Sequence, residues 1–182
     1  KIHIIHLLMT TPAAASQAYA IKLVIDALST SKIQEHKNLH YSGLMLIDYL
    51  YKHATKTVMD KIGKQIFLSL FQFIVKIKAL KAAKAKAKVA AVSTSILNIN
   101  EEKKVPQQQI YIPSAKIIGL SFVMLGKLSE KIPAIFNRNT KIISVLFQAF
   151  YSYQNNDDII QSICESLNYI RQSYHLNQDQ QV

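Results

Sequence analysis

Three consecutive segments between residues 113 and 175 place apolar side chains at the spacing of amphipathic helices. Only short polar breaks, at residues 133–139 and 155–158, separate the segments. Connections this short make neighbouring helices pack antiparallel, so the pattern predicts a helical hairpin and the helix that precedes it. The apolar positions are Ile118, Leu125, Leu128 and Ile132 in the first segment; Ile142, Ile143, Leu146, Phe147 and Phe150 in the second; and Ile160, Ile163, Leu167, Ile170 and Tyr174 in the third.

Composition restricts the fold class further. The chain has 182 residues, of which 49% are hydrophobic and 18% charged, and this is enough apolar material for one good core. Its four glycines and four prolines are few for a β-sandwich or an α/β sheet, whose turns use both residue types. We therefore predict an all-α protein.

The N-terminal part continues the helical pattern. We interpret residues 1–10 as the end of a preceding helix. The chain starts at Lys1 without an initiator Met or a leader sequence, so we expect it to be cut from something longer. Further helices are predicted at about 12–28, 33–54 and 58–80.

A change of composition marks residues 82–112, where a Lys/Ala alternation gives way to Ser and Thr and then to charged residues and glutamines. The Ala/Lys part can extend the preceding helix, but it has no apolar stripe to pack against a neighbour. We therefore predict that residues 82–112 form a mobile insertion.

Once that insertion is set aside, related helix pairs recur along the chain. The similar positions Leu128 and Ile170 lie 42 residues apart. Two-helix units of roughly 40 to 47 residues are the period of HEAT and armadillo repeats. We predict a HEAT/armadillo-like α-solenoid of antiparallel helix hairpins, with repeats at 12–56, 57–132 (which carries the insertion) and 138–175, and a polar tail at 176–182.

The net charge of +11 is concentrated in one stretch. Twenty of the 22 basic residues are lysines, and eight of these lie between residues 76 and 104. Only Arg138 and Arg171 are arginines. Proteins that read phosphates and bases rely on the planar fork of arginine, so this charge does not favour nucleic acid as the partner.

Two further features bear on the location of the chain. No apolar run is long enough to predict a membrane span. The single cysteine, Cys164, excludes a disulfide framework and a thiolate metal site, which suits a cytosolic or nuclear chain.

Histidine pairs are the first candidates for a metal site. His3 with His6, and His36 with His40, have metal-ligand spacing on a helix. Neither pair has the Glu of an HExxH motif or a third ligand nearby in the sequence, so we interpret them as solvated helix histidines.

Candidates for catalysis are equally few. Asp157 and Asp158 are interpreted as charges at the start of a helix, which are more common than paired catalytic carboxylates. Cys164 lies beside Ile163 on a predicted packed face with no His in register, and this does not favour a nucleophile. Single glycines within helices predict close helix packing rather than phosphate binding, and the tyrosines predict core and rim packing. These residues are Gly43, Gly63, Gly119 and Gly126, and Tyr41, Tyr49, Tyr51, Tyr151, Tyr153, Tyr169 and Tyr174.

No catalytic, cofactor-binding or metal-binding residue is therefore predicted, and we expect no enzyme activity. Residues that bind partners are not identified by the sequence.

Several short sequence motifs between residues 119 and 175 follow one another in a characteristic order. They are Leu125-Gly126-Lys127-Leu128 followed by Pro133, then Ile135-Phe136-Asn137, Leu146-Phe147-Gln148-Ala149-Phe150, the acidic turn at 155–158, and Ile163-Cys164-Glu165-Ser166-Leu167. In this order they resemble the HEAT-repeat region of the proteasome adaptor and scaffold family. The upstream segments YSGLMLIDYLYKHA and KIGKQIFLSLFQFI are similar to a preceding helix pair of that family, more weakly.

This resemblance implies a non-enzymatic scaffold in the cytoplasm and nucleus. Its expected partners are the core and regulatory particles of the proteasome, which a curved solenoid would bridge, and other proteins. The acidic turn reads Asn-Asn-Asp-Asp, and the helix after it lacks the early Arg of many HEAT repeats. A HEAT-repeat adaptor for transport or assembly, whose lysine-rich insertion binds an acidic partner, therefore stays open as an alternative. An RNA-binding helical repeat is a third hypothesis.

Overall fold

The computed structural model describes residues 14–97, 111–134 and 141–178, and the described residues form helices without any strand. The predicted all-α class is confirmed for this part of the chain. The helices are α2 (Ala14–Ala27), α3 (His40–His53), α4 (Lys56–Leu97), α5 (Ala115–Lys131), α7 (Lys141–Ser152) and α8 (Asp157–Gln178).

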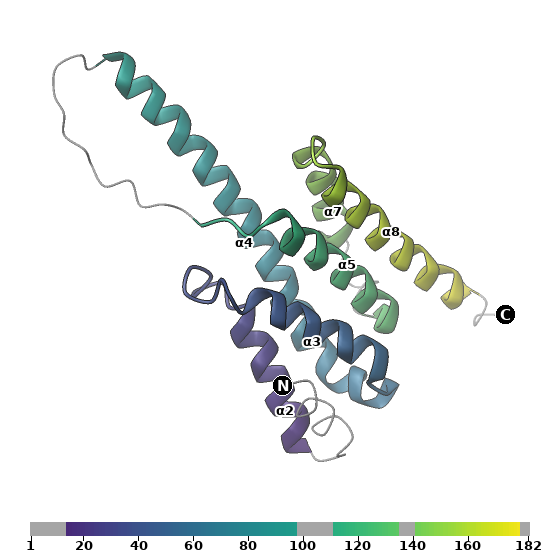
Figure 1. Cartoon of the computed structure of the whole chain (residues 1–182). Coiled ribbons are helices and arrows are strands. Elements are labelled where there is room, and N and C mark those ends of the chain that lie inside the picture. Colours follow the sequence, from purple (N-terminus) through teal and green to yellow (C-terminus); the bar gives the residue numbers. More distant parts are fainter. Residues whose placement is uncertain (1–13, 98–110, 135–140, 179–182) are drawn as a thin grey trace.

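The helices pack in two rows (Figure 1). Helices α3, α5 and α8 lie side by side, with α5 in contact with both of its neighbours. Behind them, α4 contacts α2 and α5, while α7 contacts α8. This arrangement is compatible with an α-solenoid. The division into three HEAT-like repeats stays a prediction.

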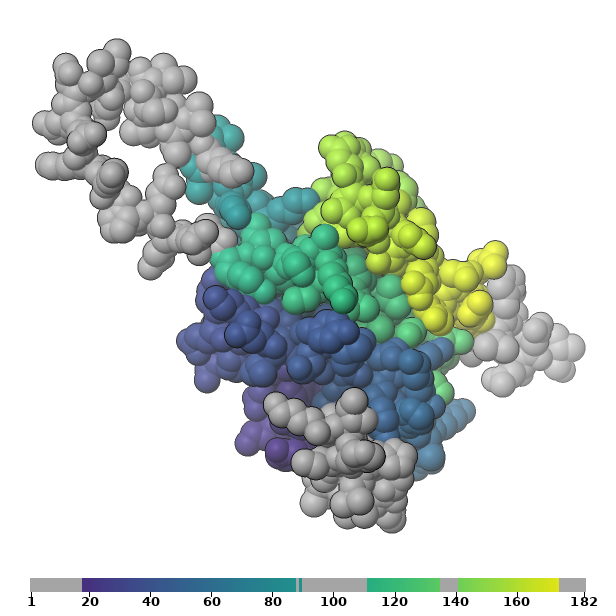
Figure 2. Space-filling view, in the orientation of Figure 1, coloured from purple at the N-terminus to yellow at the C-terminus, as the bar shows by residue number. Residues whose placement is uncertain are grey.

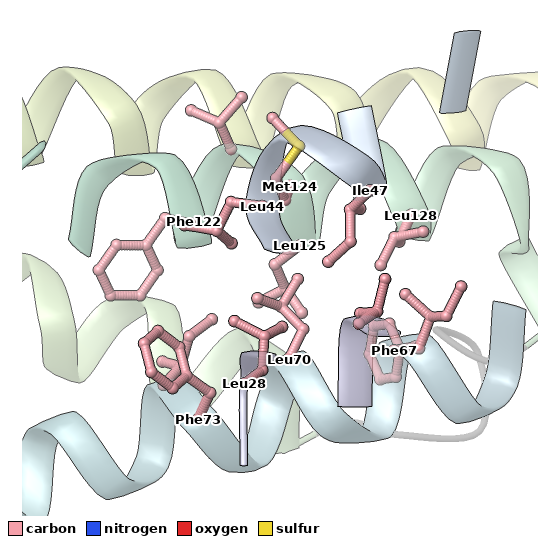
Figure 3. Packing of buried hydrophobic residues seen from close by; sticks show 14 of the residues in the cluster. Leu28, Leu44, Ile47, Phe67, Leu70, Phe73, Phe122, Met124, Leu125 and Leu128 are labelled. Atoms are coloured by element: carbon pink, nitrogen blue, oxygen red, sulfur yellow. The ribbon is translucent and has the colours of Figure 1, made fainter. Parts of the chain in front are cut away.

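The core lies between the two rows (Figure 3). On α4, the apolar residues that recur at helical spacing from Ile62 to Ile77 are buried in this core. On α7 the prediction was partly wrong. Phe147 and Phe150 are 55% and 38% exposed, because they lie on a side of the helix that no described helix covers. The central residues drawn in Figure 3 include Leu28, Leu44, Ile47, Phe67, Leu70, Phe73, Phe122, Met124, Leu125 and Leu128.

Helix α3 begins later than the predicted position 33. Residues 28–39 form turns and bends that fold back towards α2. Ile33 is buried in the core, and the ring of His36 donates a hydrogen bond from Nδ1 to the carbonyl oxygen of Asp26 at 2.6 Å. This bond satisfies a carbonyl in the last turn of α2, where helices leave such groups without a partner.

Helix α4 is 42 residues long and continues to Leu97. Residues 82–97, which we expected to be part of a mobile insertion, are therefore helical, as in the alternative in which the Ala/Lys part extends the helix. Helix propensity is the physical reason over residues 82–91, where all residues but one are Ala or Lys, both strong helix formers. Residues 98–110 of the expected insertion lie outside the described residues. The end of α4 stands clear of the packed helices (Figure 1). Figure 2 shows the last described side chains of α4, in teal, projecting from the packed helices.

The tightest helix pair is α5 with α8. A side chain added at Gly126 would place its Cβ 2.7 Å from the Cα and 2.8 Å from the carbonyl oxygen of Ser166. A Cβ at Gly119, two turns earlier, would lie 2.7 Å from the Oγ of Ser162. Only glycine lets the two backbones approach this closely. The prediction that these glycines serve helix packing is confirmed.

Replacing Gly126 by Ala should separate α5 from α8. The new methyl group meets backbone atoms that cannot move aside, so we expect Gly126→Ala to lower the free energy of unfolding by about 2 to 3 kcal/mol. Gly119→Ala is the matched control, because its methyl group meets a side chain and not a backbone. The Ser162 hydroxyl can turn away by giving up its exposed hydrogen bond to the Asp158 carbonyl oxygen, and a helix gains about 1 kcal/mol from Gly to Ala. Urea denaturation of both variants measures the difference. Equal losses at the two positions would contradict the close backbone contact at Gly126.

Candidate partner-binding surface

A groove of about 580 Å³ runs along the face formed by α3, α5 and α8. We call it the front groove. It carries both signs of charge around an apolar floor, as the polar interfaces of protein complexes do. Its lining residues are Met45, Asp48, Lys52, Ala115, Lys116, Gly119, Leu120, Val123, Met124, Lys127, Asp158, Ser162 and Glu165.

Asp48 of α3 holds one wall of the front groove to α5. Its carboxylate accepts a hydrogen bond from Lys127 Nζ at 2.5 Å and forms an ion pair with Lys52 Nζ at 2.7 Å. The side chains of Asp48 and Lys127 are only 16% and 13% exposed, whereas that of Lys52 is 57% exposed. Burial alone would raise the pKa of Asp48, but the hydrogen bonds from Lys127 and Lys52 outweigh it and hold the pKa below its ordinary value.

A second cross-helix contact joins Tyr51 of α3 to Glu130 of α5. The tyrosine hydroxyl donates a hydrogen bond to Glu130 Oε2 at 2.5 Å. Burial, and then the neighbouring carboxylate of Glu130, raise the pKa of Tyr51. The ammonium of Lys127 also lies 5.4 Å and 5.9 Å from the ring centroids of Tyr51 and Tyr169, so one lysine connects α3, α5 and α8.

The charges that a partner can reach lie elsewhere in the front groove. Lys116, Asp158 and Glu165 are exposed. Neither carboxylate has an ion pair within the described part of the chain, and the Lys116 ammonium lies 5.2 Å from the ring centroid of Tyr41. Together with the exposed Lys52, the groove therefore offers two cations and two anions to a partner, while Asp48 and Lys127 are engaged with each other.

The pairing of Asp48 with Lys127 was not predicted from the sequence. They are 79 residues apart, so no local spacing connects them. The sequence does contain a signal for this pair, because each residue is a single charge inside an otherwise apolar helical segment. The segments are LMLIDYL and VMLGKL. A half-buried charge of this kind needs a partner on a neighbouring helix.

Breaking the Asp48–Lys127 pair should destabilise the fold. We expect Asp48→Asn to lower the free energy of unfolding by about 1 to 3 kcal/mol, because Lys127 would keep its charge in a half-buried place without a carboxylate. The double variant Asp48→Asn/Lys127→Met should lose less than the sum of the two single variants. The more exposed Lys52→Met is the control and should cost below about 0.5 kcal/mol. Strict additivity in the double-mutant cycle would show that the pair is not coupled.

His40 is fully buried, which corrects our interpretation of it as a solvated histidine. Its ring packs against Phe73 at a centroid distance of 4.8 Å and stacks on Tyr111 at 6.0 Å. Neither ring nitrogen has a hydrogen-bond partner in the described structure. Burial, and to a smaller extent the charge of His36, lower the pKa of His40 to about 4. His36 lies in the turns before α3, where its Nδ1 is bonded to the carbonyl oxygen of Asp26, so the expected position of His36 and His40 on one helix was wrong.

The lowered pKa of His40 predicts a loss of stability in mild acid. The folded state keeps the ring neutral down to about pH 4, whereas the unfolded chain takes up the proton near the ordinary value of 6.5. Stability that is present above about pH 6.5 is therefore lost as the pH falls towards 4, by up to about 3 kcal/mol. His40→Leu should remove this part of the pH dependence, as measured by urea denaturation between pH 7 and 4. The exposed His53→Leu on the same helix is the control, and an unchanged slope in His40→Leu would refute the assignment.

The other candidates have structural places. Asn156 caps α8, because its Oδ1 accepts a hydrogen bond from the amide of Ile159 at 3.1 Å, and Asp157 and Asp158 lie in the first turn. Cys164 is exposed, so its expected place on a packed face was wrong. His3 and His6 lie outside the described residues.

The described residues contain neither a candidate metal cluster nor a candidate membrane span. No group of three or more His, Cys, Asp or Glu side chains is placed to hold a metal ion. None of the helices there is long and apolar enough to cross a membrane.

Comparison with known proteins identifies one family. The family model described as "Proteasome component ECM29, N-terminal" matches residues 1–182 of the chain. The resemblance to the proteasome adaptor and scaffold family, first based on residues 119–175, is thus confirmed for the whole chain. No curated protein and no solved structure matches.

Proposed function

Because the chain belongs to the family of the proteasome component ECM29, matching its N-terminal model over residues 1–182, we propose that it is a non-catalytic scaffold. In this role it binds the proteasome and helps to hold the core and regulatory particles together. The family match over the full length carries the proposal. The cytoplasm and nucleus are the expected places of action.

The packing of α5 against α8 supports a scaffold role. A protein that connects two bodies gains affinity from engaging both at once, and this gain requires that its surfaces keep a fixed relative position. The contact of Gly126 with the backbone of Ser166 fixes α8 on α5, and the ion pair of Asp48 with Lys127 fixes α3 on α5. The three helices that form the front groove are therefore held together on both sides of α5.

The front groove is the proposed contact surface. Its exposed charges, Lys52, Lys116, Asp158 and Glu165, suit a protein partner with both signs of charge. We propose no reaction in the front groove, because the least exposed acid and base of the groove, Asp48 and Lys127, already bind each other.

Binding of the chain to purified proteasome core particle and regulatory particle, each immobilised separately, tests the proposal. We expect binding to both particles, and a charge reversal in the groove, Glu165→Lys with Lys116→Glu, should weaken it about tenfold. Lys64→Glu, at an exposed position of α4 outside the groove, is the matched control.

Binding to neither particle would refute the scaffold role. Binding to one particle alone would refute the bridging role. An equal loss from the groove variant and from Lys64→Glu would refute the front groove as the contact surface.

A further inference from the structure

The point where α4 leaves the packed helices forms a second hollow, on the opposite row from the front groove. It measures about 310 Å³ and lies between α4, α5 and α7. We call it the arm cleft, and we call residues 82–97 of α4 the arm. The cleft is mostly apolar and includes Ile77, Ala82, Ala85, Phe122, Val145 and Tyr153 in its lining. A hollow of this size is at the small end of ligand pockets and accommodates one or two large apolar side chains.

Two lysines of α4 lie at the rim of the arm cleft. Lys81 Nζ donates a hydrogen bond to the carbonyl oxygen of Ser152 at 2.7 Å and lies 3.7 Å from the ring centroid of Tyr153. Lys78 Nζ donates a hydrogen bond to the side-chain oxygen of Gln148. Both partners are neutral acceptors, so neither ammonium is paired with a carboxylate within the described residues. Burial lowers the pKa of Lys81, which means that its surroundings do not yet compensate its charge.

The arm adds more positive charge and no negative charge. Lys84 and Lys86 are exposed on it, and α4 has no acidic residue after Asp60. Lysines with no acid at neighbouring helical positions repel one another and create a positive potential along the helix. A partner that supplies carboxylates would remove this repulsion.

The chemistry of the cleft and of its rim specifies one kind of partner. An apolar hollow accepts an apolar side chain, while the ammonium groups beside it attract negative charge. Lysines bind carboxylates as point charges and lack the planar fork that arginine offers to phosphates and bases. The combination favours a protein segment over a nucleic acid.

We propose that the arm cleft binds an acidic segment of a partner protein. An apolar side chain of the segment enters the cleft, and the neighbouring carboxylates lie against Lys78, Lys81 and Lys84. This inference does not depend on the proposed role on the proteasome, because it concerns another face of the molecule and names the partner by its chemistry alone.

A matched pair of variants on the arm tests the proposal. Ala85 lines the cleft, whereas Ala87, two residues further along the helix, points to the opposite side at about 100° per residue. Both alanines are exposed, so Ala85→Glu and Ala87→Glu introduce the same charge on the same helix without disturbing the core. Far-UV circular dichroism checks that both variants keep the helical content of the original chain.

The probe is a fluorescein-labelled ten-residue peptide with a central Leu-Phe pair flanked by Asp and Glu, measured by fluorescence anisotropy. A second peptide has Ser-Ser in place of Leu-Phe. We expect the first peptide to bind with a Kd on the order of 10 to 100 μM and the second about tenfold more weakly. Ala85→Glu should weaken the first peptide about tenfold, and Ala87→Glu about twofold. Higher salt should weaken binding as well.

Four outcomes would overturn the proposal. The first is a Kd for the Leu-Phe peptide above about 1 mM. The second is equal affinity for the two peptides, which would leave only unspecific charge attraction. The third is an equal effect of Ala85→Glu and Ala87→Glu, which would place the binding outside the cleft. The fourth is tighter binding of a labelled thymidine oligonucleotide, which would favour nucleic acid as the partner.

Discussion

The rest of the structure depends on the close approach of two helix backbones at Gly126. With no side chain at this position, α8 lies against α5 along a seam of small residues, and the Oγ of Ser166 is enclosed without a hydrogen-bond partner in the described structure. A buried hydroxyl in this state costs about 1 to 3 kcal/mol. The structure tolerates that cost because close-packed backbones gain many small dispersion contacts along the pair. Ser121 and Ser129 of α5 avoid the same cost by donating to carbonyl oxygens of their own helix.

Helix α5 distributes three different kinds of contact around its circumference. Glycines face α8, and Lys127 bonds to α3. Large apolar side chains such as Phe122 and Leu125 face α4 (Figure 3). These contacts differ in specificity. Apolar packing onto α4 tolerates small shifts, whereas an ion pair and a backbone contact each allow one register only. The front groove is bounded by the two specific contacts, so its shape is fixed more strictly than the core behind it requires.

The sequence predicted the fold class and most of the buried faces, because helical periodicity reports which side of a helix is apolar. It did not predict which neighbours cover each side. Phe147 fits the apolar spacing of α7 but lies where no described helix covers it. His40, on α3, is a polar residue and yet lies in the core. The front groove could not be predicted from the sequence for a related reason, since Asp48 and Lys127 meet only through the packing of α3 on α5. For residues 82–97, composition suggested a loop because an isolated helix without an apolar face is marginal. Continuity with a packed helix removes the need for a new nucleus, and propensity then suffices.

The course of α4 shows how one helix serves two purposes. Up to Ile77 its inner face is buried in the core, and from Ala82 its side chains are exposed wherever they are described. The change occurs at Lys81, whose ammonium binds a carbonyl oxygen in the last turn of α7. That carbonyl lies at the negative end of the α7 helix dipole, so the ammonium of Lys81 stabilises the end of α7. Beyond this point α4 has no neighbour among the described helices to pack against. A continued apolar stripe there would expose a hydrophobic surface that promotes aggregation. Over residues 81–88, lysine and alanine keep the helix formed and its surface polar, so the composition changes where the packing ends.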